Sequence, residues 1–151
     1  MTVIDALNKW ERRSFRYGDA DCCQFAGFIA RELTGTNYLK SFQYASEEAA
    51  YQIIEGHGSL KEAVISVLGD PTDDLDELPD GSPVLLEVPR HGEVMGVKLG
   101  DQAVCLVQNG MAQLPKKLIK SGWNLCRREL LLDSLQSLKL VSLLPVQWGR
   151  L

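Results

Sequence analysis

The chain changes its pattern of apolar residues once, at the acidic, proline-bounded segment from Asp70 to Gly81. Before that segment, apolar residues recur at intervals of three and four, which is typical of helices that bury one face. After it, short runs rich in valine and leucine are separated by turn residues such as Asn109 and Gly110, which is typical of strands joined by hairpins. Helices followed by strands predict the α+β class, with N-terminal helices packed on an antiparallel sheet.

Cap residues mark where the helices begin. Thr2, Asp21, Ser46 and Ser59 each precede an amphipathic segment, and their side-chain oxygens are suited to accept from the first turn of a helix. We therefore expect helices over residues 3–13, 22–34, 47–55 and 60–68, the last three ended by glycines. In the second half we expect strands over residues 83–88, 94–99, 103–107 and 111–114.

The second expected helix has a cysteine in its first turn. Asp21 is the N-cap, Cys22 follows it, and Gln24 lies three residues after the cap, which is a capping-box arrangement. The unpaired N–H groups and the dipole at a helix N-terminus favour a thiolate, so we expect the pKa of Cys22 to fall below the ~8.5 of a free thiol. Several cysteine hydrolases hold their nucleophile in this way. The alternative interpretation is a small buried cysteine in a helix that docks on the core.

Large apolar residues predict where the core lies. The face of the Cys22 helix that is expected to pack on the sheet contains Phe25, Phe28, Ile29 and Leu33. We also expect five aromatic side chains to lie mainly in the core: Trp10, Phe15, Tyr17, Phe25 and Trp123.

Length and charge exclude some classes of function. The 151 residues are enough for one domain with its own core. A net charge of −4 provides no basic face for a phosphate backbone, so we expect no nucleic-acid partner. The first ten residues lack a basic segment followed by an apolar run, so we expect no signal peptide. No stretch reaches the ~18–20 apolar residues of a membrane span.

The four cysteines are Cys22, Cys23, Cys105 and Cys126, and they lack the paired spacing of a zinc site. We expect free thiols, a reducing origin and neither a metal nor a cofactor. The side chains of Cys22 and Cys23 should diverge in a regular helix, which would make them poor disulfide partners. A metal ion or an iron–sulfur cluster held by all four cysteines stays open as an alternative.

Three segments together resemble a known family. Residues 17–26, Y-G-D-A-D-C-C-Q-F-A, resemble the D-C-S-G-[LF] motif of NlpC-type cysteine peptidases. Residues 81–84 and 94–100, G-S-P-V and V-M-G-V-K-L-G, resemble that family's later G-D-L-V and H-V-G-I-Y-L-G motifs. The resemblance covers roughly residues 15–114 and implies a papain-like fold, found in enzymes that cleave peptidoglycan stem peptides. The chain also resembles a phage-encoded branch of this superfamily, whose members lie among tail genes.

The catalytic histidine of that family falls at Val94 in this chain. A cysteine hydrolase of this type needs an imidazole near the sulfur to activate the thiol and protonate the leaving amine, and valine can do neither. His91, in the turn before Val94, is a candidate replacement that would act on Cys22. His57, between two glycines after a helix, is a second candidate.

The remaining site residues are expected from their position. The resemblance places Tyr17, Asp21 and Val94 on a cleft beside Cys22. Gln102 and Gln108 are candidates for a residue that orients the base, by location only.

The final segment, residues 127–151, is rich in leucine, and polar residues interrupt it. We therefore divide the chain into an NlpC-like domain, residues 1–126, and an interaction tail, residues 127–151. Exposed leucines cost solubility unless they are covered. We expect the tail to bind a partner through Leu135, Leu138, Leu140 and Trp148, and folding back over the sheet edge is the alternative.

These features lead to three hypotheses about function. The first is a structural or assembly component of a phage tail, in the tip, hub or baseplate, built on an inactive papain-like fold. Its partners would be other phage tail proteins, and it would be assembled in the host cytoplasm and located in the virion. The second is an active cysteine peptidase or amidase that uses Cys22 and His91 on peptidoglycan. The third is a ligand-binding domain that keeps the cleft without the chemistry.

Overall fold

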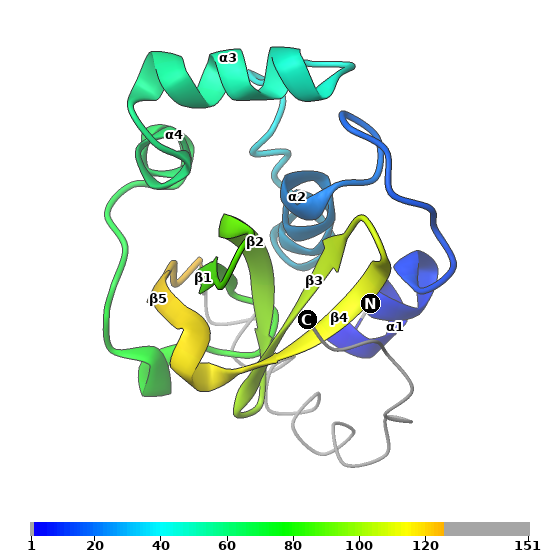
Figure 1. Cartoon of the computed structure of the whole chain (residues 1–151). Coiled ribbons are helices and arrows are strands. Elements are labelled where there is room, and N and C mark those ends of the chain that lie inside the picture. Colours follow the sequence, from blue (N-terminus) through cyan, green and yellow to red (C-terminus); the bar gives the residue numbers. More distant parts are fainter. Residues whose placement is uncertain (1, 126–151) are drawn as a thin grey trace.

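The computed structural model describes residues 2–125 and has the α+β architecture that the sequence predicts (Figure 1). Four helices come first: α1 (Val3–Trp10), α2 (Cys22–Thr34), α3 (Glu47–His57) and α4 (Leu60–Leu68). Five antiparallel strands follow: β1 (Pro83–Val88), β2 (Gly92–Leu99), β3 (Gln102–Val107), β4 (Gly110–Pro115) and β5 (Ile119–Gly122). Their order in the sheet is β4-β3-β2-β1-β5. Single 3-10 turns cover Leu75–Glu77 and Lys116–Leu118.

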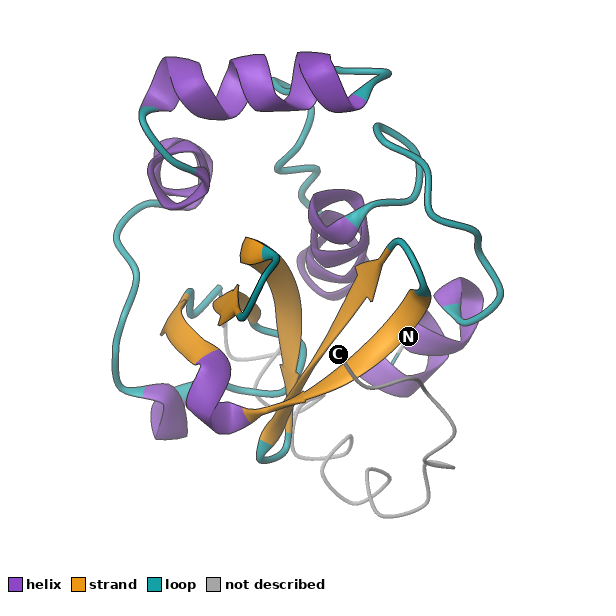
Figure 2. Ribbon diagram, viewed as in Figure 1, coloured by secondary structure: helices purple, strands orange, loops and turns teal. Residues whose placement is uncertain are grey.

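The four predicted caps are all present. The side chains of Thr2, Asp21, Ser46 and Ser59 each accept a hydrogen bond from the backbone N–H three residues later. Short turns join β1 to β4 in sequence, and only Gly58 and Ser59 separate α3 from α4, whereas longer loops separate α1 from α2 and α2 from α3 (Figure 2). The cap residues therefore mark where each helix begins, as the sequence predicts.

Two predicted helix ends were wrong. Helix α1 ends at Trp10 rather than at residue 13. There the guanidinium of Arg13 lies over the Trp10 ring, 4.2 Å from its centroid, and pairs with Asp19 at 2.9 Å, so the chain turns back instead of continuing the helix. Helix α3 continues through Gly56 to His57, because Gly58, with a φ of 100°, provides the C-cap.

Strand β5 was not predicted. It has only four residues, and it pairs with β1 across a register shift between Leu85 and Leu86. The next residue, Trp123, is fully buried and donates its indole N–H to the carbonyl oxygen of Gly69 at 2.8 Å. That bond ties the end of the sheet to the end of α4.

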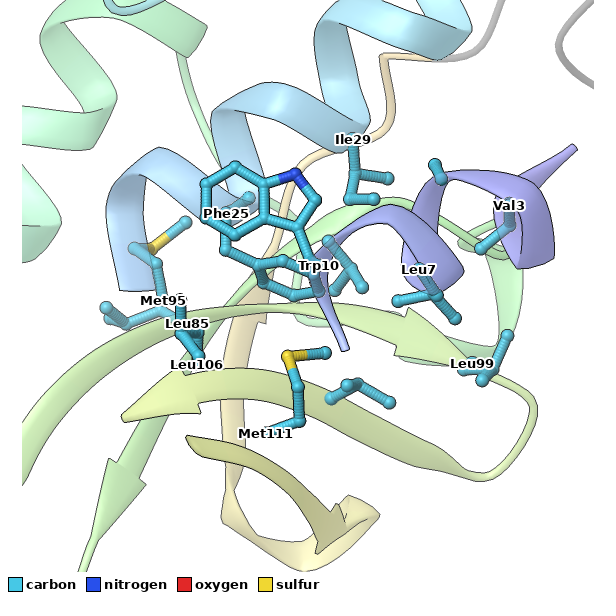
Figure 3. Packing of buried hydrophobic residues seen from close by; sticks show 14 of the residues in the cluster. Val3, Leu7, Trp10, Phe25, Ile29, Leu85, Met95, Leu99, Leu106 and Met111 are labelled. Carbon is cyan, nitrogen blue, oxygen red and sulfur yellow. The ribbon is translucent and has the colours of Figure 1, made fainter. Parts of the chain in front are cut away.

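Helix α2 packs on the sheet through the predicted face (Figure 3). Phe25 and Ile29 are fully buried, and Trp10 of α1 meets the Phe25 ring edge-on at 5.7 Å. Phe28 and Leu33 are partly buried at the margin of the same cluster. On the sheet, this cluster comprises Leu85, Met95, Val97, Leu99, Val104, Leu106 and Met111.

The aromatic prediction was correct for Trp10, Phe25 and Trp123 and wrong for Phe15 and Tyr17. Phe15 and Tyr17 are only partly buried, and their rings meet edge-on at 5.0 Å in the loop before α2. The two rings pack on each other, and Phe15 also packs against the margin of the core cluster.

The other face of the sheet is also apolar. A second cluster forms there from Val84, Leu86, Val88, Val94, Ala103, Cys105, Val107, Ala112, Leu114 and Ile119, together with Leu78. Cys22 packs against both clusters. The first turn of α2 therefore contacts both apolar clusters through Cys22. None of the helices within residues 2–125 is long and apolar enough to cross a membrane.

Candidate functional site

The N-terminus of α2 is held by the carboxylate of Asp21, which is buried and hydrogen-bonded on both oxygens. One oxygen accepts from the N–H of Gln24 at 2.8 Å, as an N-cap does. The other accepts from the N–H of Gly18 at 2.8 Å and from the hydroxyl of Tyr44 at 2.7 Å. Asp21 thus fixes the first turn of α2, the loop before it and the loop before α3 relative to one another.

A cleft of about 330 Å³ opens beside this turn. It brings together the five site residues that we predicted: Tyr17, Asp21, Cys22, His91 and Val94. Its other walls come from the loop before α3, from α3, from the β1–β2 turn and from the end of β3, and include Tyr44, Glu47, Tyr51, Ile54, Arg90, Glu93 and Gln108. Charged groups of both signs therefore face the space next to the Cys22 sulfur.

Cys22 and Cys23 form a contact pair at the base of this cleft. Their sulfurs lie 3.9 Å apart and both thiols are free. The expectation that these side chains diverge was wrong, because the two sulfurs are in contact and both residues line the same cleft.

The contact between the two sulfurs shifts the pKa values of the two thiols in opposite directions. The pKa of Cys22 is lowered, chiefly because the Cys23 thiol donates a hydrogen bond to its sulfur, with further help from the backbone amide of Met95. Burial and the Asp21 carboxylate oppose this lowering. The pKa of Cys23 is raised well above its ordinary value, because its proton is held in that same hydrogen bond and because the thiol is buried. The direction predicted for Cys22 is confirmed, but its main cause is the neighbouring thiol.

Neither histidine is hydrogen-bonded to Cys22 within the described part of the chain. His91 is exposed in the β1–β2 turn, where its backbone N–H donates to the carbonyl of Val88 at 3.0 Å, and its side chain lies at the cleft wall. His57 ends α3, where its Nδ1 lies 2.9 Å from the Ile53 carbonyl oxygen and its ring meets Phe42 edge-on. His57 is not among the residues that line the cleft.

Val94 occupies the part of the sheet that reaches the cleft. It is buried in the second apolar cluster, against which Cys22 also packs. The cleft therefore presents an apolar side chain where the resemblance would place an imidazole. Of the two glutamines considered, Gln108 lines the cleft together with Tyr17, whereas Gln102 is exposed at the start of β3, opposite Leu99.

A smaller apolar pocket of about 90 Å³ adjoins the cleft and lies between α2, α3 and α4. The two spaces share the side chains Cys23, Tyr44, Ala50, Ile54 and Leu60. Small residues, Ala26, Gly27 and Ala30, form this face of α2, and the side chain of Leu39 packs closely on Gly27.

The sequence analysis missed the wall of the cleft formed by Tyr44, Glu47 and Tyr51. No local pattern marks these residues, because the loop from 36 to 45 is placed by the bond from Tyr44 to Asp21, 23 residues away. The cap motif at Asp21 was the available signal, since it identified the carboxylate to which that loop attaches.

Within residues 2–125 no group of three or more histidine, cysteine or acidic side chains is arranged to hold a metal ion. Cys126 lies outside the described residues. So do the predicted tail and its partner-binding candidates Leu135, Leu138, Leu140 and Trp148.

The fold and the cleft define an α+β domain with a cysteine at a helix N-terminus that faces an open space. The chain belongs to the family described as a domain of unknown function, DUF6950, whose model matches residues 2–125. No curated protein matches the chain.

Proposed function

We propose that this protein is a structural or assembly component of a phage tail, in the tip, hub or baseplate, built on an NlpC-like, papain-like fold that has lost its peptidase chemistry. Its partners would be other tail proteins, and it would be located in the virion after assembly in the host cytoplasm. The resemblance of residues 15–114 to phage-encoded members of that superfamily supports the proposal. The helix-then-sheet order of the fold is compatible with it.

The observation that carries the loss of chemistry is the side chain of Val94. It is buried in the cluster against which Cys22 packs, on the wall of the cleft. Cysteine peptidase chemistry needs a group there that takes a proton from the thiol and later returns one to the leaving amine. A valine side chain has no group that exchanges protons, so the cleft can hold a peptide without cleaving it.

A second candidate function, an active cysteine peptidase or amidase, is favoured by one specific observation. His91 lines the same cleft as Cys22, and the pKa of Cys22 is lowered. A substrate that drew the β1–β2 turn inward would bring this imidazole toward the sulfur. Catalytic hydrogen bonds are often long before the substrate binds, so the exposed position of His91 does not exclude this function.

Hydrolysis of purified muropeptides by the full chain separates the two candidates. We expect no turnover above that of Cys22→Ala. Turnover that is lost in Cys22→Ala and reduced in His91→Ala would establish the second candidate. Val94→His is the matched gain-of-function variant. If Val94 stands where a base once stood, this variant should increase the rate of alkylation of Cys22 by iodoacetamide at neutral pH.

The assembly role is tested in the phage or prophage that encodes the chain. We expect the protein in purified particles and expect deletion of its gene to stop tail assembly. Complementation by Cys22→Ala should restore assembly, whereas a chain that lacks residues 128–151 should fold without restoring it. Normal tails after deletion, or particles without the protein, would refute the role.

A further inference from the structure

We propose that Cys22 is a thiol-modification site that accepts one small thiol from a low-molecular-weight disulfide of the glutathione class, and that Cys23 is the positioning residue that prepares Cys22 for this exchange. The proposal does not depend on the phage-tail role.

The two sulfurs have the geometry of a donor and an acceptor. They lie 3.9 Å apart, and the N-cap bond from Gln24 to Asp21 holds the turn that carries them. Cys22 is the first residue of α2, where unpaired backbone N–H groups favour negative charge. The contact between the two thiols lowers the pKa of Cys22 and raises that of Cys23, so Cys22 is the one that ionises first. The attacking atom in a disulfide exchange is a thiolate sulfur of this kind.

The cleft provides access for the other reactant. Cys22 lines an open space of about 330 Å³ whose walls include Arg90 and Glu93 from the β1–β2 hairpin and Glu47 from α3. Small thiols of the glutathione class carry both amino and carboxylate groups. A wall with charges of both signs can pair with each of them.

An internal disulfide between Cys22 and Cys23 is disfavoured by the backbone. Neighbouring residues joined by a trans peptide have Cα atoms about 3.8 Å apart, below the 4.4–6.8 Å usual for disulfides. The structure contains no cis peptide bond in its described part. A 22–23 bridge would therefore require the first turn of α2 to break, so the expected oxidised product is a mixed disulfide on Cys22.

The chemical step balances without a further reactant. The Cys22 thiolate attacks one sulfur of the small disulfide, a new bond forms between Cys22 Sγ and that sulfur, and the original S–S bond breaks. The departing half leaves as a thiolate and takes up the proton that Cys22 released, so one disulfide is exchanged for another. Excess small thiol reverses the step.

The third described cysteine does not resolve the adduct. Cys105 is fully buried, and burial raises its pKa to about 12, so it stays protonated at neutral pH. With Cys105 protonated and a bridge to Cys23 disfavoured, the adduct on Cys22 should persist until an external thiol removes it.

The test uses the full chain with Cys126→Ser as the parent background, which removes the cysteine outside the described residues. The protein is incubated with glutathione disulfide over a range of pH, and the adduct is located by intact mass and peptide mapping. We expect one glutathionyl group, on Cys22, that dithiothreitol removes. Cys22→Ser should not be modified.

The role of Cys23 is tested by a matched pair of variants. Cys23→Ala removes the donor, so the rate at neutral pH should fall several-fold and the pH–rate profile should move to higher pH. Cys23→Ser keeps a hydroxyl donor and should stay close to the parent. A merely structural role for Cys23 would lower the melting temperature without moving the pH–rate profile. An adduct on Cys105, a 22–23 disulfide in the parent, or unchanged profiles in Cys23→Ala would overturn the proposal.

Discussion

The hydroxyl of Tyr44 donates a 2.7 Å hydrogen bond to the carboxylate of Asp21, and this bond joins the loop before α3 to the cap of α2. The same carboxylate oxygen accepts from the N–H of Gly18. Burial, together with the nearby negative groups, raises the pKa of Tyr44 far above its ordinary value, so the hydroxyl keeps its proton and remains a donor. The wall of the cleft formed by α3 is therefore attached to the helix that carries Cys22.

Replacement of Tyr44 by phenylalanine should lower the free energy of unfolding by about 1.5–3 kcal/mol, the usual contribution of a hydrogen bond to a charged group. Urea denaturation measures the change. Tyr51→Phe is the matched control, because Tyr51 lines the same cleft but is 51% exposed. Equal midpoints for Tyr44→Phe and the parent would show that the bond does not stabilise the fold.

A methyl group at Gly18 should be far more costly than one at Gly35. Both glycines have left-handed φ values, 82° and 80°, which disfavour alanine by roughly 1–2 kcal/mol. A Cβ at Gly18 would also lie 1.9 Å from the carbonyl oxygen of Tyr44, whereas nothing lies within 4 Å of one at Gly35. Gly18→Ala should therefore shift the thermal midpoint well beyond Gly35→Ala, and similar shifts would contradict the close approach of the two loops.

Truncation of Phe25 should remove the centre of the core under α2. The side chain is fully buried and meets Trp10 edge-on. Phe25→Ala should cost on the order of 3–5 kcal/mol, because it loses apolar burial and leaves a cavity. Phe15→Ala should cost clearly less, since Phe15 is only partly buried. A parent-like denaturant midpoint for Phe25→Ala would mean that Phe25 is not part of the core.

The buried Cys105 thiol should make the fold sensitive to alkali. Burial raises its pKa from 9.0 to about 12. Between these values the unfolded chain has released the proton and the folded chain has kept it. The stabilisation is therefore complete below pH 9 and is lost as the pH rises toward 12, by roughly 4 kcal/mol over three pKa units.

Cys105→Ala isolates this contribution, because every other alkaline group is unchanged. Its free energy of unfolding, measured by denaturant titration from pH 8 to pH 11, should decline less steeply than that of the parent. Parallel curves would show that Cys105 is not buried as a neutral thiol.

Local chemistry accounts for what the sequence predicted well. A cap such as Asp21 and a stop such as Gly35 act over three or four residues, so the bounds of α2 follow from the residues themselves. The turn residues that separate the apolar runs of β1 to β4 are similarly local signals. Strand β5 has four residues, and its pairing with β1 depends on residues about 35 positions earlier, which no short pattern records.

In the candidate site, too, local motifs were predicted well and contacts that depend on the tertiary structure were missed. Cys22, Tyr17 and Val94 were placed on one cleft from motifs at two positions in the chain, and the structure brings them together. The contact between the Cys22 and Cys23 sulfurs depends on side-chain rotamers, and the wall at Tyr44 depends on a bond over 23 residues. Neither relationship has a signature in sequence spacing.

The placement of α2 on β2 also has a consequence during synthesis. Phe25 and Ile29 pack on Met95 and Val97, and about 60 residues separate the end of α2 from the start of β2. Ribosomes add about 5–20 residues each second, so β2 is synthesised on the order of several seconds after α2. Until then the apolar face of α2 lacks the strand on which it packs. At the start of that interval α1 has already been made, and its Trp10 can shield Phe25. The nascent chain should therefore be most prone to bind chaperones between the emergence of α2 and that of β2.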